Sequence, residues 1–76
     1  MVQKSASAER FDAWLRRRAK RAAFRVAAEI GVDESYVSHL RAGRRVPSLR
    51  VAALIEKLTR GRVRANGWVG ATRVAA

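Results

Sequence analysis

The sequence contains no cysteine and only one histidine in 76 residues. Without cysteine, the chain can form neither a disulfide nor a cysteine-based metal site, and this composition fits a reducing compartment. His39 has no further ligand residues at a spacing that would let it hold a metal, and no glycine-rich phosphate loop is present. We therefore expect no cofactor.

Acidic residues are also few, with six Asp and Glu against seventeen Lys and Arg. They are scattered or stand at predicted helix starts, and no catalytic constellation of nucleophile, base and carboxylate can be assembled from them. The adjacent Asp33 and Glu34 are explained more economically as a helix start. We expect neither enzymatic activity nor a small-molecule substrate.

Long apolar runs are missing as well. No stretch of about 18 apolar residues could span a membrane, and no apolar segment follows the basic start as a signal peptide requires. We expect a cytoplasmic protein, nucleoid-associated when bound, with no membrane partner. A membrane-active cationic peptide is a minor alternative, because Phe11, Trp14 and Leu15 with nearby arginines are compatible with an interfacial helix.

Positive charge is what the chain has in excess, with a formal net charge of +11. Such an excess destabilises a small compact protein unless a polyanion neutralises it. Arginine supplies most of the charge, and its planar fork suits phosphate oxygens and guanine edges. Nucleic acid is therefore the expected partner. Duplex DNA is favoured over RNA, because the exposed aromatics that stack on unpaired bases are few.

Residues 23–43 have the pattern of two short helices joined by a tight turn. Gly31 follows the first helix, where a left-handed backbone is needed. Apolar residues recur at helical spacing on either side of it: Val26, Ala27, Ile30, Val37 and Leu40. Two helices joined by such a corner form a helix-turn-helix.

The second helix is expected over 34–42, with Asp33 as its side-chain cap and Gly43 at its end. At about 100° per residue, the residues that make core contacts fall on one arc: Asp33, Val37 and Leu40. The opposite arc is small and polar: Ser35, Ser38, His39 and Ala42. Such a face can enter a major groove without steric obstruction, although a solvated helix face has the same composition.

We expect residues of this helix to contact base edges: Ser35, Ser38, His39 and Arg41. The residues expected at the DNA backbone flank it: Arg21, Arg25, Tyr36, Arg44 and Arg45. Arg44 and Arg45 stand at the exit of the helix, within reach of a phosphate strand. The basic cluster over 16–25 is expected to contribute further backbone contacts, with a solvated helix end as the alternative.

Two more helices complete the prediction. The first is expected from Ser7, its cap, to about Arg18 or Ala19, with Phe11 and Trp14 in the core. The last is expected over 49–58, capped by Ser48. The domain is thus expected over 7–69, between a disordered arm at 1–6 and a flexible tail at 70–76.

The segment before the tail allows two predictions. Asn66-Gly67 between alternating charged and apolar residues indicates a β-hairpin, and a short turn of helix with Trp68 on the core is the alternative. Val63, Trp68 and Val69 are expected to be exposed and to form the dimer contact, by strand pairing across a two-fold axis.

The run Y-V-S-H-L-R-A-G-R-R-V-P-S at 36–48, with Ala27 and Gly31, resembles the helix-turn-helix of the phage Cro/repressor family and its small chromosomal relatives. The resemblance is less specific over about 8–64. It implies a fold of five helices, or of four helices and a strand, and operator binding as a homodimer. Many members place a phosphate-binding Gln where this chain has Ala23, so that contact is either weaker or passes to Arg21 or Arg25.

The sequence therefore predicts a mainly all-α domain of four to five short helices that contains a helix-turn-helix. The predicted function is a sequence-specific transcriptional regulator, a repressor that binds a palindromic double-stranded DNA operator as a homodimer. Helix 34–42 would lie in the major groove. The alternative is an antitoxin-like regulator whose main role is to bind a partner protein.

Overall fold

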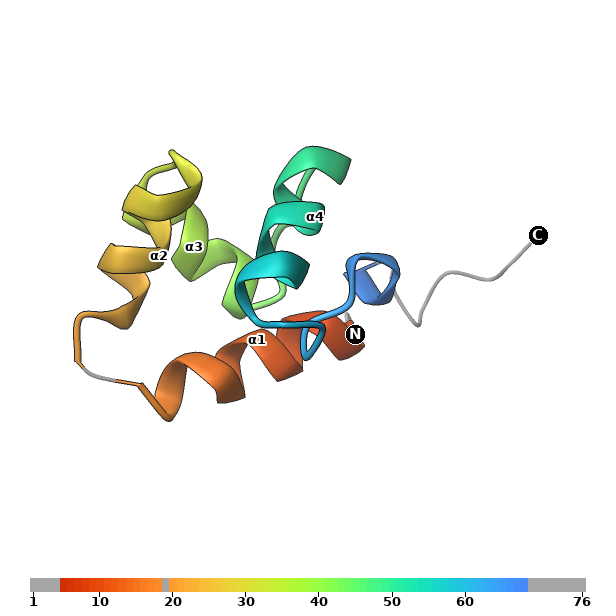
Figure 1. The fold of residues 1–76 in the computed structure, drawn as a ribbon, viewed down its shortest axis with the longest axis horizontal. Helices are drawn as coiled ribbons and strands as arrows, with labels where there is room; N and C mark the ends of the chain where they lie inside the picture. The colour runs from red at the N-terminus through yellow and green to blue at the C-terminus, as the bar shows by residue number, and fades with distance from the viewer. Residues whose placement is uncertain (1–4, 19, 69–76) are drawn as a thin grey trace.

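Four α-helices and one short 3-10 helix make up the part of the chain that the computed structural model describes, residues 5–18 and 20–68 (Figure 1). In chain order these are α1 (Ala6–Arg16), α2 (Ala22–Ile30), α3 (Glu34–Arg41), α4 (Leu49–Leu58) and the 3-10 helix η1 (Ala65–Trp68). No strand occurs within these two ranges, and the all-α prediction is confirmed. η1 returns to lie beside the first turns of α1.

Serine side chains set two of the helix starts. The Ser5 hydroxyl oxygen accepts a hydrogen bond from the Ala8 N–H (3.1 Å), so α1 begins before the predicted cap Ser7, which is buried instead. Ser48 accepts from the Val51 N–H (3.2 Å) and starts α4 as predicted. Ser5 therefore belongs to the fold and not to a disordered arm. The remaining arm, 1–4, and the predicted tail, 70–76, lie outside the described residues.

The core takes apolar side chains from every helix: Phe11, Leu15, Val26, Ala27, Ile30, Val37, Leu40, Val51, Ile55, Val63 and Trp68. The rings of Phe11 and Trp68 meet edge to face, with centroids 5.9 Å apart and planes at 74°. Such a pair contributes about 0.5–1.5 kcal/mol beyond the area that it buries. Trp14 is only partly buried, so the prediction of a core position holds in full for Phe11 alone.

The segment after α4 folds back onto the core, and the predicted β-hairpin is wrong. Asn66 and Gly67 lie within η1, as the alternative prediction had it. The reason lies in two side chains of the α4 region: Thr59 Oγ1 accepts from the Val63 N–H (3.1 Å), and Glu56 Oε1 accepts from the Ala65 N–H (2.9 Å). Backbone donors that a strand partner would satisfy thus find acceptors nearby.

The same fold-back corrects the predicted dimer contact. Val63 and Trp68 are 0% and 2% exposed, because the chain's own core takes them up. Their expected exposure is therefore wrong, and they are not accessible to a second subunit. Val69, the third residue of that contact, lies outside the described residues.

η1 is held against α1 by a contact that leaves no room at Gly67. The Ser7 hydroxyl donates a hydrogen bond to the Arg64 carbonyl oxygen (2.6 Å), and a Cβ added at Gly67 would overlap the Ser7 Oγ. Gly67→Ala should therefore destabilise the protein by about 1–3 kcal/mol, the usual cost of overpacking. Thermal unfolding followed by circular dichroism measures the loss.

A double-mutant cycle isolates the cause. Ser7→Ala alone loses one hydrogen bond, which costs about 1 kcal/mol, but it removes the atom that crowds Gly67. The double variant should therefore lose less than the sum of the two single losses. Strictly additive losses would show that Ser7 does not limit the space at Gly67.

Candidate nucleic-acid interface

A glycine corner joins α2 to α3, as the sequence predicts. Gly31 has φ +80° and ψ 37°, in the left-handed region that favours glycine. The N–H groups of Gly31 and Val32 both donate to the Ala27 carbonyl oxygen, at 2.8 and 2.9 Å. These bonds close the end of α2 and direct the chain through an extended Asp33 into α3.

Asp33 occupies the N-cap position of α3, but the predicted side-chain cap is wrong. Its carboxylate accepts no hydrogen bond from the first turn. The N–H groups of Tyr36 and Val37 donate instead to the Asp33 carbonyl oxygen, at 3.1 and 3.3 Å. Asp33 is also exposed, although the helical wheel groups it with core residues, because it precedes the first helical turn.

The other residues of α3 divide into the two arcs that the sequence predicts. Val37 and Leu40 are both 0% exposed. Ser35 and Ser38 are exposed, and His39 is half-exposed. The outward face of α3 therefore offers two hydroxyls and one imidazole, which are small groups that can donate to or accept from base edges.

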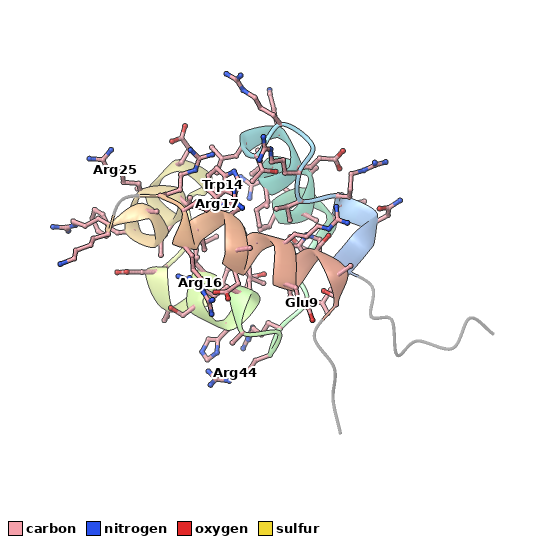
Figure 2. The ribbon with its side chains drawn as sticks, turned by 90° about the horizontal axis from the view of Figure 1, so that it is seen from below. Glu9, Trp14, Arg16, Arg17, Arg25 and Arg44 are labelled. Atoms are coloured by element: carbon pink, nitrogen blue, oxygen red, sulfur yellow. The ribbon has the colours of Figure 1, made fainter. Side chains whose placement is uncertain are left out.

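The loop after α3 places two exposed guanidinium groups beside this face. Arg44 follows Gly43, whose φ is +80°, and its N–H donates to the His39 carbonyl oxygen (2.9 Å). Figure 2 shows Arg44 projecting outward on the α3 side of the molecule. The Arg45 guanidinium lies 6.0 Å from the ring centroid of the half-buried Tyr36. Neither arginine has an ion-pair partner among the described residues.

Arg41 is directed elsewhere. Its Nε donates to Asp12 Oδ1 on α1 (2.7 Å), and a guanidinium nitrogen of Arg16 lies 3.2 Å from the other oxygen of that carboxylate. The predicted guanine contact would require Arg41 to leave Asp12. Sequence analysis did not single out Asp12, because only its spacing to Arg16, four residues on, is visible in the sequence.

Two arginines predicted to contact phosphate, Arg21 and Arg25, lie at the N-cap and in the first turn of α2. The Arg21 guanidinium lies over the exposed Phe24 ring, 4.7 Å from its centroid. Arg25 borders a depression formed with α1 and α4, and Figure 2 shows it projecting in a different direction from Arg44. The cluster over 16–25 is thus spread over several surfaces.

The described residues contain no group of three or more His, Asp or Glu side chains that could hold a metal ion. None of their helices has the length and apolar character that a membrane span requires. The chain matches no protein-family model, no curated protein and no solved structure. The resemblance to the Cro/repressor family therefore stays an expectation from the motif.

The Asp12–Arg41 pair predicts a stability effect that sets Arg41 apart from its neighbours. Arg41→Ala should destabilise the protein by about 1–2 kcal/mol, because a partly buried charged hydrogen bond between α1 and α3 is lost. Urea unfolding measures the change. Arg44→Ala removes the same charge from an exposed site and should change stability little. Equal unfolding midpoints for the two variants would contradict the structural role of Arg41.

Proposed function

We propose that this protein binds double-stranded DNA through α3 and regulates transcription as a repressor. One observation carries the proposal: Ser35, Ser38 and His39 face outward from a helix whose apolar residues are buried, and two arginines with no ion-pair partner among the described residues follow its end. Small polar side chains can approach base edges in the major groove. Guanidinium groups at its border can contact the phosphate strand.

Electrostatics support the same partner. The formal net charge of +11 favours binding to a polyanion, because neutralised phosphates release their counterions. Arg41 is held by Asp12, so the proposal assigns base discrimination to the two serine hydroxyls and the imidazole of α3. We therefore expect strongly salt-dependent binding with moderate sequence preference.

The symmetry of the complex belongs to the proposal as well. A palindromic operator needs two subunits about one DNA turn apart. The proposal that the protein is a homodimer follows from its resemblance to Cro-like regulators. Sedimentation equilibrium of the full chain, free and on a palindromic site, measures it. Under this proposal the protein is cytoplasmic and is associated with the nucleoid when it is bound to DNA.

If Arg44 contacts a phosphate, its removal should change how the duplex-binding affinity depends on salt concentration. Arg44→Ala should weaken binding to every duplex and reduce the slope of log K against log salt by about one unit. Fluorescence anisotropy with a labelled duplex at several salt concentrations measures both. Arg62→Ala, an equal loss of charge in the loop after α4, should leave the slope nearly unchanged. An altered site preference with an unaltered slope would contradict the phosphate role.

Base reading by α3 makes a different prediction. His39→Ala and Ser38→Ala should each relax selectivity at one position of the site, by at most about 1–3 kcal/mol, the range of a good base contact. Selection of bound fragments from a random duplex pool, with each variant and the parent chain, reports this. The Arg44→Ala variant is expected to select the parental site. Identical sites for all variants would mean that α3 does not read bases.

A further inference from the structure

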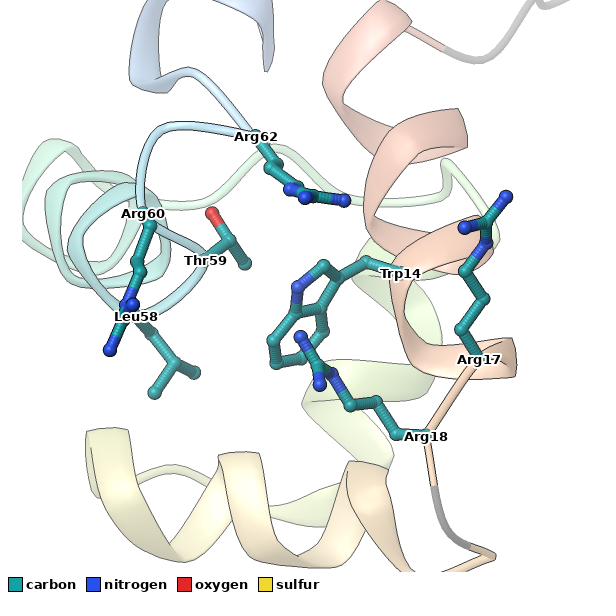
Figure 3. Close-up of a pocket in the computed structure, with 7 residues that line it drawn as sticks. All are labelled: Trp14, Arg17, Arg18, Leu58, Thr59, Arg60 and Arg62. Carbon is teal, nitrogen blue, oxygen red and sulfur yellow. The ribbon is translucent and has the colours of Figure 1, made fainter.

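A groove on the other side of α1 from α3 gathers arginine side chains around Trp14 (Figure 3). It is open to solvent, has a volume of about 840 Å³ and lies between the end of α1 and the chain reversal after α4. Figure 2 shows Trp14 and Arg17 on one side of α1, and Arg16 and Arg44 on the other. The groove is therefore separate from the proposed duplex-binding surface.

The groove carries uncompensated positive charge. Four arginines line it: Arg17, Arg18, Arg60 and Arg62. Within residues 5–18 and 20–68, none of these guanidiniums forms an ion pair with a carboxylate, and the nearby Glu29 borders an adjoining depression. The ends of α1 and α4 together supply about one negative charge from their dipoles, well below four. The surplus favours binding of an anion.

The centre of the groove adds a flat aromatic surface. The Arg18 guanidinium lies over the Trp14 ring, 4.1 Å from its centroid, and Trp14 is half-exposed. A guanidinium stacked in this way keeps its N–H edge free for phosphate oxygens and offers its outer plane to a base. An anion that also carries a planar ring uses both features.

We propose that this groove binds a nucleotide, with its phosphate on Arg18, Arg60 and Arg62 and its base on the Arg18–Trp14 stack. Figure 3 shows Arg18 and Arg62 reaching toward the indole and Arg60 on the opposite wall, whereas Arg17 points away. The volume is that of ligand pockets in general, about 300–1,000 Å³.

The nucleotide is either free or part of a single strand, because a duplex hides the faces of its bases. Adjoining depressions with Arg10 on one side of Trp14 and Arg25 on the other would let a strand continue. The inference does not rest on the proposed duplex-binding function, since it uses none of the α3 residues.

Calorimetric titration of the full chain with ATP, inorganic pyrophosphate and a short oligothymidylate tests the inference. ATP should bind more tightly than pyrophosphate. Trp14→Leu should weaken ATP about tenfold, the effect of losing one base stack, and leave pyrophosphate unchanged. Arg62→Ala should weaken both by about tenfold, as the loss of a charged hydrogen bond does.

Arg44→Ala is the matched control, because it removes one exposed arginine from the α3 side. It should change ATP binding less than about twofold, since distant charges are screened, while it weakens duplex binding. Equal losses in Arg44→Ala and Arg62→Ala would show general charge attraction and overturn the inference. So would equal affinity for ATP and pyrophosphate, or unchanged ATP binding in Trp14→Leu, with circular dichroism confirming the fold of each variant.

The two sources of the nucleotide are separated by the oligothymidylate. Binding at least about tenfold tighter than ATP, with a salt slope of several units, assigns the groove to single-stranded nucleic acid. Weaker or equal binding assigns it to a free nucleotide. Competition by polyglutamate as strong as that by the oligonucleotide would show that an acidic chain suffices, and the inference would be wrong.

Discussion

The fold depends on how six carboxylates are placed among seventeen basic residues. Asp12 joins α1 to α3 through two arginines, and Glu56 holds the C-terminal fold-back through a backbone N–H and a guanidinium. Glu9 and Glu34 stand in the first turns of α1 and α3, where the helix dipole favours a negative charge. Asp12 and Glu56 thus join segments that are distant in the sequence, and neither pairs with the arginines at 44, 45, 60 or 62.

With seventeen basic and six acidic residues, several arginines of the described part of the chain have no ion-pair partner, and they gather in two regions. Helix ends and loops collect guanidinium groups beyond α3, at Arg44 and Arg45, and around Trp14 beyond α1 and α4. Self-repulsion of this charge lowers the stability of the free protein, and an anionic partner restores it. The two regions differ in chemistry, because the first borders a face of hydroxyls and imidazole, whereas the second surrounds an indole. Under the two proposals, the first would contact duplex DNA, and the second would bind a free nucleotide or a single strand.

Local signals predicted the parts of this structure that local forces decide. Gly31 stands where the backbone is left-handed, a conformation that favours glycine. Ser48 caps α4, and the spacing of Val37 and Leu40 determines the buried face of α3. The Asn66-Gly67 signal failed because Thr59 and Glu56 satisfy the backbone donors that follow α4, and the core has room for Trp68. Contacts between segments distant in the sequence decide between a hairpin and a 3-10 helix here. The ion pair of Asp12 with Arg41 and the groove around Trp14 depend on such contacts too, so the sequence pattern did not predict them.

The pairing of Arg41 with Asp12 also has a consequence for binding under the proposed mode. A bidentate arginine–guanine contact contributes about 1–3 kcal/mol, similar to the partly buried hydrogen bond that Arg41 would have to leave. An exchange would therefore gain little, and it would leave Asp12 with one arginine fewer. Keeping Arg41 on Asp12 therefore preserves the contact between α1 and α3. In the proposed complex, sequence preference would then depend on Ser35, Ser38 and His39, and affinity on Arg44 and Arg45.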